Sequence, residues 1–156
     1  MKQFLMILFG LTLIPLPAAD QAAFTHWPSA ELKAHADRLA AKASPTWKGA
    51  AEVISKVGNH NVWMVHRFAT GDAEWHEMQA DLFVIQTGEA TVVVGGELVN
   101  ERSTNPVEKA APSTRGGQAK KVAAGDIVYI PAKTAHHVQV EAGKQVNYFI
   151  LKIPTT

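Results

Sequence analysis

The stretch that decides the fold is Gly125-Asp-Ile-Val-Tyr-Ile-Pro-Ala-Lys-Thr-Ala-His136, which continues into His-Val-Gln-Val140. Apolar and β-branched residues fill positions 127–130, as is typical of a short strand, and a proline ends the run. In a strand, residues two apart point to the same face. His136 therefore shares a face with Val138 and Val140, and valines favour a core. The pattern predicts a strand that carries His136 into the interior of the domain.

A second stretch, Glu74-Trp-His-Glu-Met-Gln-Ala-Asp81, offers the partners that such a histidine needs. Glu74 and His76 are two residues apart, so a strand would project both side chains to one side. Residues 77–80 can form a turn, after which Asp81 begins the next strand beside them. Two imidazoles with one or two carboxylates form a mixed nitrogen and oxygen site. Such a set suits Zn²⁺, Mn²⁺, Fe²⁺, Ni²⁺ or Co²⁺, and the ligand types do not select one of these ions.

Together the two stretches resemble the two conserved motifs of the cupin family. The second cupin motif reads Gly, five residues, Pro-x-Gly, two residues, His. Gly125, Pro131 and His136 stand at the matching positions, whereas Lys133 replaces the second glycine. The resemblance extends over roughly residues 60–153, which is most of the β-rich part of the chain.

The first cupin motif reads His-x-His, three or four residues, Glu, six residues, Gly. His76 matches its second histidine, Asp81 its glutamate and Gly88 its glycine. Glu74 falls where the family usually has its first histidine. The resemblance implies an all-β fold, a cupin-type jelly-roll barrel of two antiparallel sheets. It also implies a divalent transition metal held by His76, Asp81, His136 and Glu74.

Several side chains of the expected site keep alternative roles. Asp81 is either a metal ligand or a polar residue at the start of a strand. Glu74 is a metal ligand, a catalytic base or a solvent-facing carboxylate. His66 alternates with apolar residues, so it is a candidate metal ligand or proton carrier if that face points inward, and otherwise a packed, hydrogen-bonded histidine. By the same alternation, Trp63 and Trp75 cover the outside of the barrel or contact the helix. His76 and His136 have the alternative of being core histidines with backbone partners.

The rest of the chain fits one barrel with an N-terminal helix. Ser29 can cap a helix whose apolar residues recur at helical spacing, and Pro45 requires the helix to stop by residue 44. From residue 51 onward, short β-rich runs alternate with Gly and Pro turns, which is typical of a sandwich or barrel. Residues 100–118 are polar and contain two prolines, and they are expected to form a loop.

The first nineteen residues have the pattern of a secretory signal. Lys2 provides the positive start, residues 4–16 form an uncharged, mostly apolar run, and Ala18 and Ala19 are small residues before the expected cleavage point. The apolar run is short for a membrane span and ends in prolines, so no stable membrane anchor is expected after processing. The expected organisation is a signal peptide over 1–19, a leader and helix over 20–50, and the barrel over 51–156, in a periplasmic or secreted protein.

Composition narrows the functional classes. The chain has 156 residues, no cysteine and a formal net charge of +1. Disulfides, thiolate metal sites and cysteine nucleophiles are excluded, and the charge balance does not favour a nucleic-acid partner. The expected function is that of an exported metal-dependent cupin acting on a small molecule by lyase, isomerase or dioxygenase chemistry. The alternative is a cupin module that binds a small ligand without catalysis. A homodimer formed through sheet edges is a further expectation.

Overall fold

The computed structural model describes residues 24–155, so the predicted signal peptide lies outside the described residues. Within this range the chain forms one helix, α1 (Ser29–Ala41), and twelve strands. The strands are β1 (Gly49–Val57), β2 (His60–Arg67), β3 (Ala73–His76), β4 (Gln79–Val94), β5 (Glu97–Val99), β6 (Arg102–Asn105), β7 (Glu108–Ala111), β8 (Ser113–Arg115), β9 (Gln118–Ala123), β10 (Ile127–Ile130), β11 (His136–Gln139) and β12 (Val146–Pro154).

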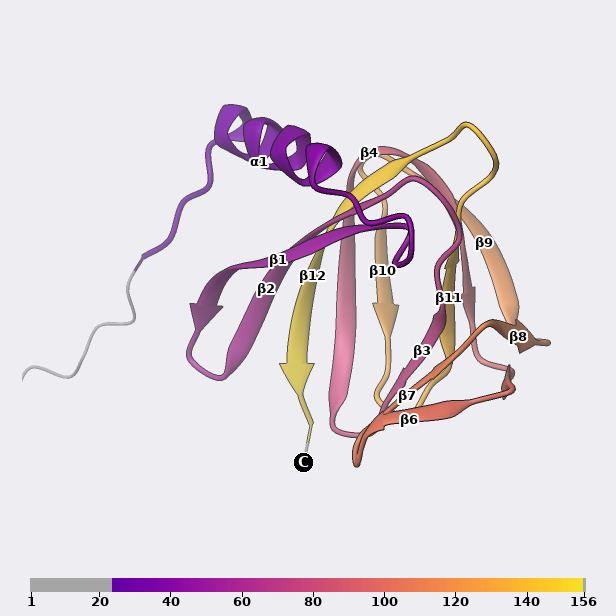
Figure 1. Cartoon of the computed structure of the whole chain (residues 1–156). Coiled ribbons are helices and arrows are strands. Elements are labelled where there is room, and N and C mark those ends of the chain that lie inside the picture. The colour runs from indigo at the N-terminus through magenta and orange to yellow at the C-terminus, as the bar shows by residue number, and fades with distance from the viewer. Residues whose placement is uncertain (1–23, 156) are drawn as a thin grey trace, which may run out of the picture.

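Two antiparallel sheets curl around one interior and share the long strand β4 (Figure 1). The first half of β4 lies between β12 and β10, in a sheet that continues through β2 to β1. The second half lies between β11 and β9, in a sheet that continues through β3 and β7 to β6. This arrangement confirms the predicted all-β jelly-roll barrel of two antiparallel sheets.

The main core fills the space between the two sheets. It consists of side chains that alternate along the strands of both sheets, as expected when one face of each strand is buried. Its buried members are Val65, Phe83, Ile85, Ala90, Val92, Val122, Ile130, Val138, Val140, Val146, Tyr148 and Ile150. Both valines that follow His136 along the chain belong to this core, so the predicted inward face of that strand is confirmed.

Gly88 marks the point at which β4 passes from one sheet into the other. Its φ is +77°, a conformation that side chains rarely adopt, and it pairs with Val146 of β12. A Cβ atom at this position would overlap the backbone carbonyl oxygen of Gln145. The glycine is therefore required both for the bend and for the close approach of the two strands.

Gly88→Ala is expected to lower the free energy of unfolding by about 2 kcal/mol or more, because left-handed strain and a backbone clash act together. Gly143→Ala is the matched control, since Gly143 has a φ of +78° but a Cβ added there would meet no atom within 4 Å. Urea unfolding of both variants measures the difference. Equal losses of stability would show that the close approach at Gly88 contributes nothing.

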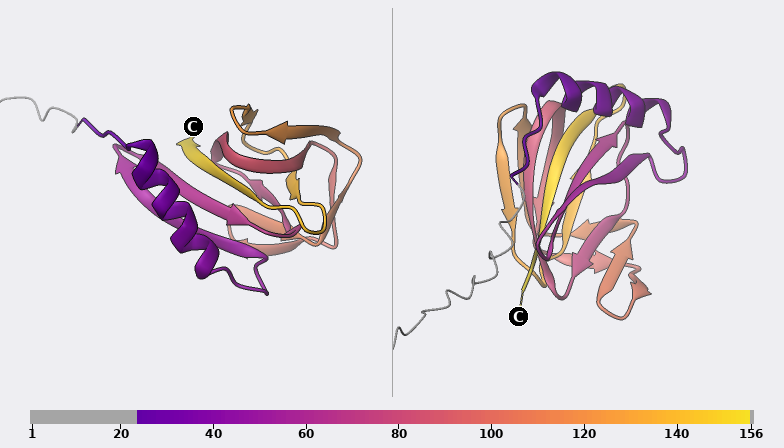
Figure 2. Two further views of the ribbon diagram at one scale, coloured as in Figure 1. Left: turned by 90° about the horizontal axis from the view of Figure 1, so that it is seen from above. Right: turned by 90° about the vertical axis from the view of Figure 1, so that its left-hand side faces the viewer.

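Helix α1 lies against the outer face of the first sheet, where it covers β1 and β2 (Figure 2). Ala36 and Leu39 of the helix pack on Met64, with Phe149 beside them, which confirms the predicted amphipathic helix.

The predicted N-cap of the helix is wrong by one position. Pro28 is the capping residue, and its carbonyl oxygen accepts the first backbone bonds of the helix. In the described range no helix is both long and apolar enough to cross a membrane.

The stretch 100–118 differs from its prediction. It contains three short strands instead of a loop, and β7 pairs with β3 so that Glu108 stands opposite His76. The stretch has few of the β-branched and aromatic residues that typify strands, so no strand was expected from its composition. Pairing of β7 with β3 on one side and with β6 on the other supplies the stability that local propensity lacks. This pairing brings a further carboxylate to the predicted site.

Candidate metal centre

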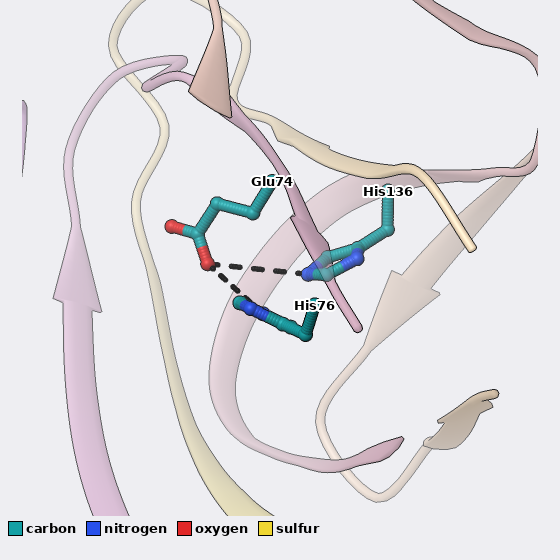
Figure 3. Close-up of side chains that lie close together, drawn as sticks. All are labelled: Glu74, His76 and His136. Carbon is teal, nitrogen blue, oxygen red and sulfur yellow. Dashed lines mark ion pairs between the residues drawn. The ribbon is translucent and has the colours of Figure 1, made fainter. Parts of the chain in front are cut away.

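Glu74, His76 and His136 converge inside the barrel (Figure 3). Glu74 and His76 project from β3 and His136 from β11, two neighbouring antiparallel strands in which Glu74 and His136 are register partners. The two imidazole rings are 5.1 Å apart, and one ligand atom from each of the three residues lies within 4.8 Å of the others. The predicted convergence of two histidines that are distant in sequence is confirmed.

His136 presents a bare nitrogen to this cluster. Its side chain is 3% exposed, and Nδ1 lies 3.2 Å from the carbonyl oxygen of Thr134. A carbonyl oxygen only accepts hydrogen bonds, so Nδ1 carries the proton and Nε2 carries the lone pair. Among the described residues Nε2 has no hydrogen-bond partner, although it is buried. Burial lowers the pKa of His136, which keeps the ring neutral and its Nε2 available as a ligand.

His76 is oriented in the same way. Its Nδ1 contacts the carboxylate of Glu108, which fixes the proton on that nitrogen and turns Nε2 toward the cluster. Burial by itself would lower the pKa of His76, but the neighbouring carboxylates of Asp81 and Glu108 outweigh burial and the repulsion from Lys152. The pKa is raised as a result. A carboxylate behind a histidine is the arrangement that commonly orients metal-binding imidazoles.

Glu74 is held between the histidines and a buried arginine. One carboxylate oxygen, Oε2, lies 3.6 Å from His76 Nε2 and 4.0 Å from His136 Nε2. The other, Oε1, lies 3.5 Å from Nη2 of Arg67. Arg67 is itself fixed, because its Nε donates to the hydroxyl of Tyr148 at 3.0 Å and its guanidinium stacks on Trp47 at 4.4 Å. Glu74 thus faces the cluster with one oxygen while the other is anchored.

Asp81 lies beside both imidazoles but is already paired. It is 1% exposed, and its Oδ2 lies 3.4 Å from His76 Nε2 and 3.6 Å from His136 Nε2. Lys152 donates to both of its oxygens, at 3.1 and 3.2 Å. Burial would raise the pKa of Asp81, yet the neighbouring His76 ring and the charge of Lys152 outweigh burial and lower it. Asp81 is therefore an ionised partner of a lysine at the edge of the cluster.

A cavity of about 820 Å³ opens onto these residues. Its volume lies within the range that is usual for small-molecule sites. Aromatic and aliphatic side chains form much of its wall, among them Trp63, Val65, Phe83, Val138 and Ile150. Glu74, His76 and His136 supply the polar end, so a molecule in the cavity would meet the candidate centre directly.

His66 does not belong to this site: it is the packed, hydrogen-bonded histidine of the second alternative, and its role as a proton carrier is wrong. In β2 the odd-numbered residues 63, 65 and 67 line the cavity, whereas Met64 and His66 point to the outer face, toward the helix. His66 is buried there and its Nδ1 bonds the side-chain oxygen of Asn147 at 2.9 Å. The prediction that Trp63 covers the outside of the barrel is wrong for the same reason. Apolar residues occupy both faces of β2 because the helix buries the outer one.

The donor set fits a divalent transition metal. Ligand atoms that surround one ion at about 2.0–2.2 Å lie roughly 3–4 Å from one another, and the distances from Glu74 to the two imidazoles fall in this range. The unpartnered Nε2 of His136 supplies the independent observation, because a buried polar atom without a partner is costly. Glu74, His76 and His136 would hold the ion, whereas Asp81 lies nearby in an ion pair with Lys152.

Three functional side chains escaped prediction: Arg67, Glu108 and Lys152. Lys152 had a readable signal, because Val146, Tyr148, Ile150 and Lys152 alternate on one face of β12 and end in a charged residue. Arg67 follows Trp63 and Val65 in the same way along β2. No comparable pattern pointed to Glu108, which reaches the site only through the pairing of β7 with β3.

Comparison with known proteins identifies a fold and no closer relationship. No family model matches the chain, and no curated protein matches it. Among solved structures, TT1209 from Thermus thermophilus has 19% identity and a TM-score of 0.53, and the match covers 77% of this chain and 94% of that one. Pac13, described as a nucleoside dehydratase, has 10% identity and a TM-score of 0.51 over 72% of this chain and 75% of its own.

A Cupin 2 conserved barrel domain protein from Salinispora arenicola also matches, with 16% identity and a TM-score of 0.45 over 66% of this chain and 73% of that one. This chain spans 65% of the polyketide cyclase RemF and 94% of TT1209. Likeness at such low identity speaks for the fold and not for the reaction. The described part of the chain is a jelly-roll barrel of two antiparallel sheets.

Proposed function

We propose that this protein is an exported, metal-dependent barrel protein of the cupin type that acts on a small molecule. The observation that carries the proposal is the paired orientation of two imidazoles. In each ring Nδ1 is bound from behind, by Glu108 or by the Thr134 carbonyl, and Nε2 faces the cluster. Export is proposed from the signal-like pattern of residues 1–19.

Charge supports a cation at this position. The groups that contact the two rings include the carboxylates of Glu74, Asp81 and Glu108, while Arg67 and Lys152 offset two of the three negative charges. One negative charge remains in a partly buried site, and a carboxylate without a counterion is less favourable there than in water. A divalent cation would reverse the sign, and the loaded site would then attract a small molecule with an anionic or strongly polar oxygen.

The chemistry follows from the residues that face the cavity. A bound divalent cation would polarise an oxygen of the small molecule and lower the pKa of a coordinated hydroxyl group or water. His76, His136 and Glu74 hold one side of the centre, and Arg67 fixes the second oxygen of Glu74. The apolar wall formed by Val65, Val138 and their neighbours would exclude water from the reacting group.

Metal binding tests the proposal. The purified full chain, stripped with a chelator and titrated with Zn²⁺, Mn²⁺ and Ni²⁺, is expected to bind one ion per chain. Glu74→Gln is expected to weaken that binding by about tenfold or more, because a charged ligand is replaced by a neutral amide. The matched control is Glu97→Gln, a surface carboxylate paired with Arg115. Stoichiometric binding that is unchanged in Glu74→Gln would remove Glu74 from the ligand set.

A second candidate function, a non-catalytic module that binds a small ligand without a metal, is favoured by one specific observation. The ammonium group of Lys152 lies 3.1 Å from His76 Nε2, where a metal would bind. If chelator-treated protein binds none of the three metals, the binding-module interpretation replaces the metal-dependent one.

A further inference from the structure

Lys152 contacts the nitrogen atom of His76 that a metal ion would bind. It extends from β12 into the cavity, its side chain is 14% exposed, and its Nζ lies 3.1 Å from His76 Nε2. Two further contacts bind the same Nζ to both oxygens of Asp81. The ammonium group thus donates its hydrogen bonds to His76 and Asp81, two residues of the candidate metal centre.

His76 cannot serve both cations at once. Its Nδ1 is engaged by Glu108, so Nε2 has the one lone pair of the ring that is directed into the site. A hydrogen bond from Lys152 uses that lone pair at 3.1 Å, whereas a metal ion would need it at about 2.0–2.1 Å. Binding of the ion therefore requires the bond between Lys152 and His76 to break.

Lys152 also removes part of the electrostatic attraction for a metal. Asp81 is buried and lies within 3.6 Å of both imidazole nitrogens, so as a free carboxylate it would favour a cation strongly. Its charge is instead neutralised by Lys152. The positive charge of the lysine additionally repels a divalent ion at short range, in surroundings that screen charges poorly.

We propose that Lys152 is a built-in competitor for the metal: it occupies His76 Nε2 and neutralises Asp81 in the metal-free protein, and so sets the metal affinity of the site. This inference rests on the metal-dependent function proposed above. Glu74, His76 and His136 are then the metal ligands, and Asp81 stays paired with Lys152. Removing the lysine frees both the imidazole lone pair and a carboxylate for the ion.

The experiment measures Zn²⁺ affinity by calorimetric titration of the chelator-treated full chain at one fixed pH and ionic strength. Lys152→Met is expected to bind Zn²⁺ about 10- to 100-fold more tightly than the wild type, because a charge-assisted hydrogen bond and a repulsive charge are both lost. Lys152→Gln keeps a polar group next to Asp81 and is expected to bind more tightly than the wild type too. Lys152→Gln replaces Lys152→Met in the measurement if the methionine variant does not fold. Lys144→Met, which removes a surface lysine paired with Glu89, is the control for net charge and should leave the affinity unchanged.

The outcomes separate this inference from the function on which it rests. Equal or weaker Zn²⁺ binding by both Lys152 variants, with binding by the wild type intact, overturns the competitor role and leaves the metal-dependent function standing. Binding by the Lys152 variants but not by the wild type would show that Lys152 blocks the site completely, and the binding-module interpretation would then replace the metal-dependent function of the natural chain. Absence of binding in the wild type and in both variants overturns the metal centre and the inference together.

Discussion

His136→Gln is expected to weaken binding of a divalent metal by at least about 100-fold. The variant loses the imidazole nitrogen that faces Glu74 and His76 and has no hydrogen-bond partner among the described residues. Changing a residue that only supports a ligand already costs about 10- to 100-fold in metal affinity, so loss of a ligand itself should cost more. Calorimetric titration with Zn²⁺ measures the change.

His66→Gln is the matched control for this experiment. His66 and His136 are equally buried, at 3% exposure, but His66 bonds Asn147 on the outer face of β2. The same substitution there should leave metal affinity unchanged, and circular dichroism should show that both variants keep the barrel. If the two variants lose affinity equally, the effect comes from general loosening of the fold and the assignment of His136 as a ligand is wrong.

Asp81→Asn is expected to lower the free energy of unfolding by about 3 kcal/mol at neutral pH, because it leaves the ammonium group of Lys152 buried without its counterion. The loss should depend on pH. The pKa of Asp81 is lowered in the folded protein, so its contribution to stability is complete above the unfolded pKa of about 3.9. The contribution disappears as the pH falls toward the folded pKa, and the two proteins should converge in acid.

Denaturant unfolding at several pH values measures this difference. Asp37→Asn is the control, since Asp37 forms an exposed pair with Lys33 that is worth less than about 1 kcal/mol. The double variant Asp81→Asn with Lys152→Met should recover much of the lost stability, because neither buried charge remains. Additive losses in the double variant would show that the two side chains do not stabilise each other.

The fold and much of the centre were predictable because they depend on local alternation. Val138 and Val140 share a strand face with His136, and because valines favour the core they predicted that His136 points inward. The two-residue spacing of Glu74 and His76 predicted that both side chains lie on one face of β3. The helix was predictable from its apolar spacing, although its first residue was not. These features depend on which face of a strand or helix is buried, and the sequence carries that information.

The remaining parts of the centre depend on which strands become neighbours. Glu108 reaches His76 through a pairing between β3 and β7 that weak β-propensity gave no reason to expect. Lys152 reaches Asp81 across the register of β12 with β4, in which these two residues are direct partners. His66 was misassigned because the helix buries the outer face of β2, so that apolar alternation did not distinguish inside from outside. Contacts between distant strands set the first two outcomes, and packing of the helix on β2 sets the third.

Anomalous diffraction from a crystal of the Zn²⁺-loaded protein tests the central claim most directly. The expected result is one strong peak inside the barrel, within about 2.0–2.2 Å of His76 Nε2, His136 Nε2 and a carboxylate oxygen of Glu74, with Lys152 withdrawn from His76. A barrel whose only zinc lies on surface residues, with Lys152 still bonded to His76 Nε2, would contradict the account.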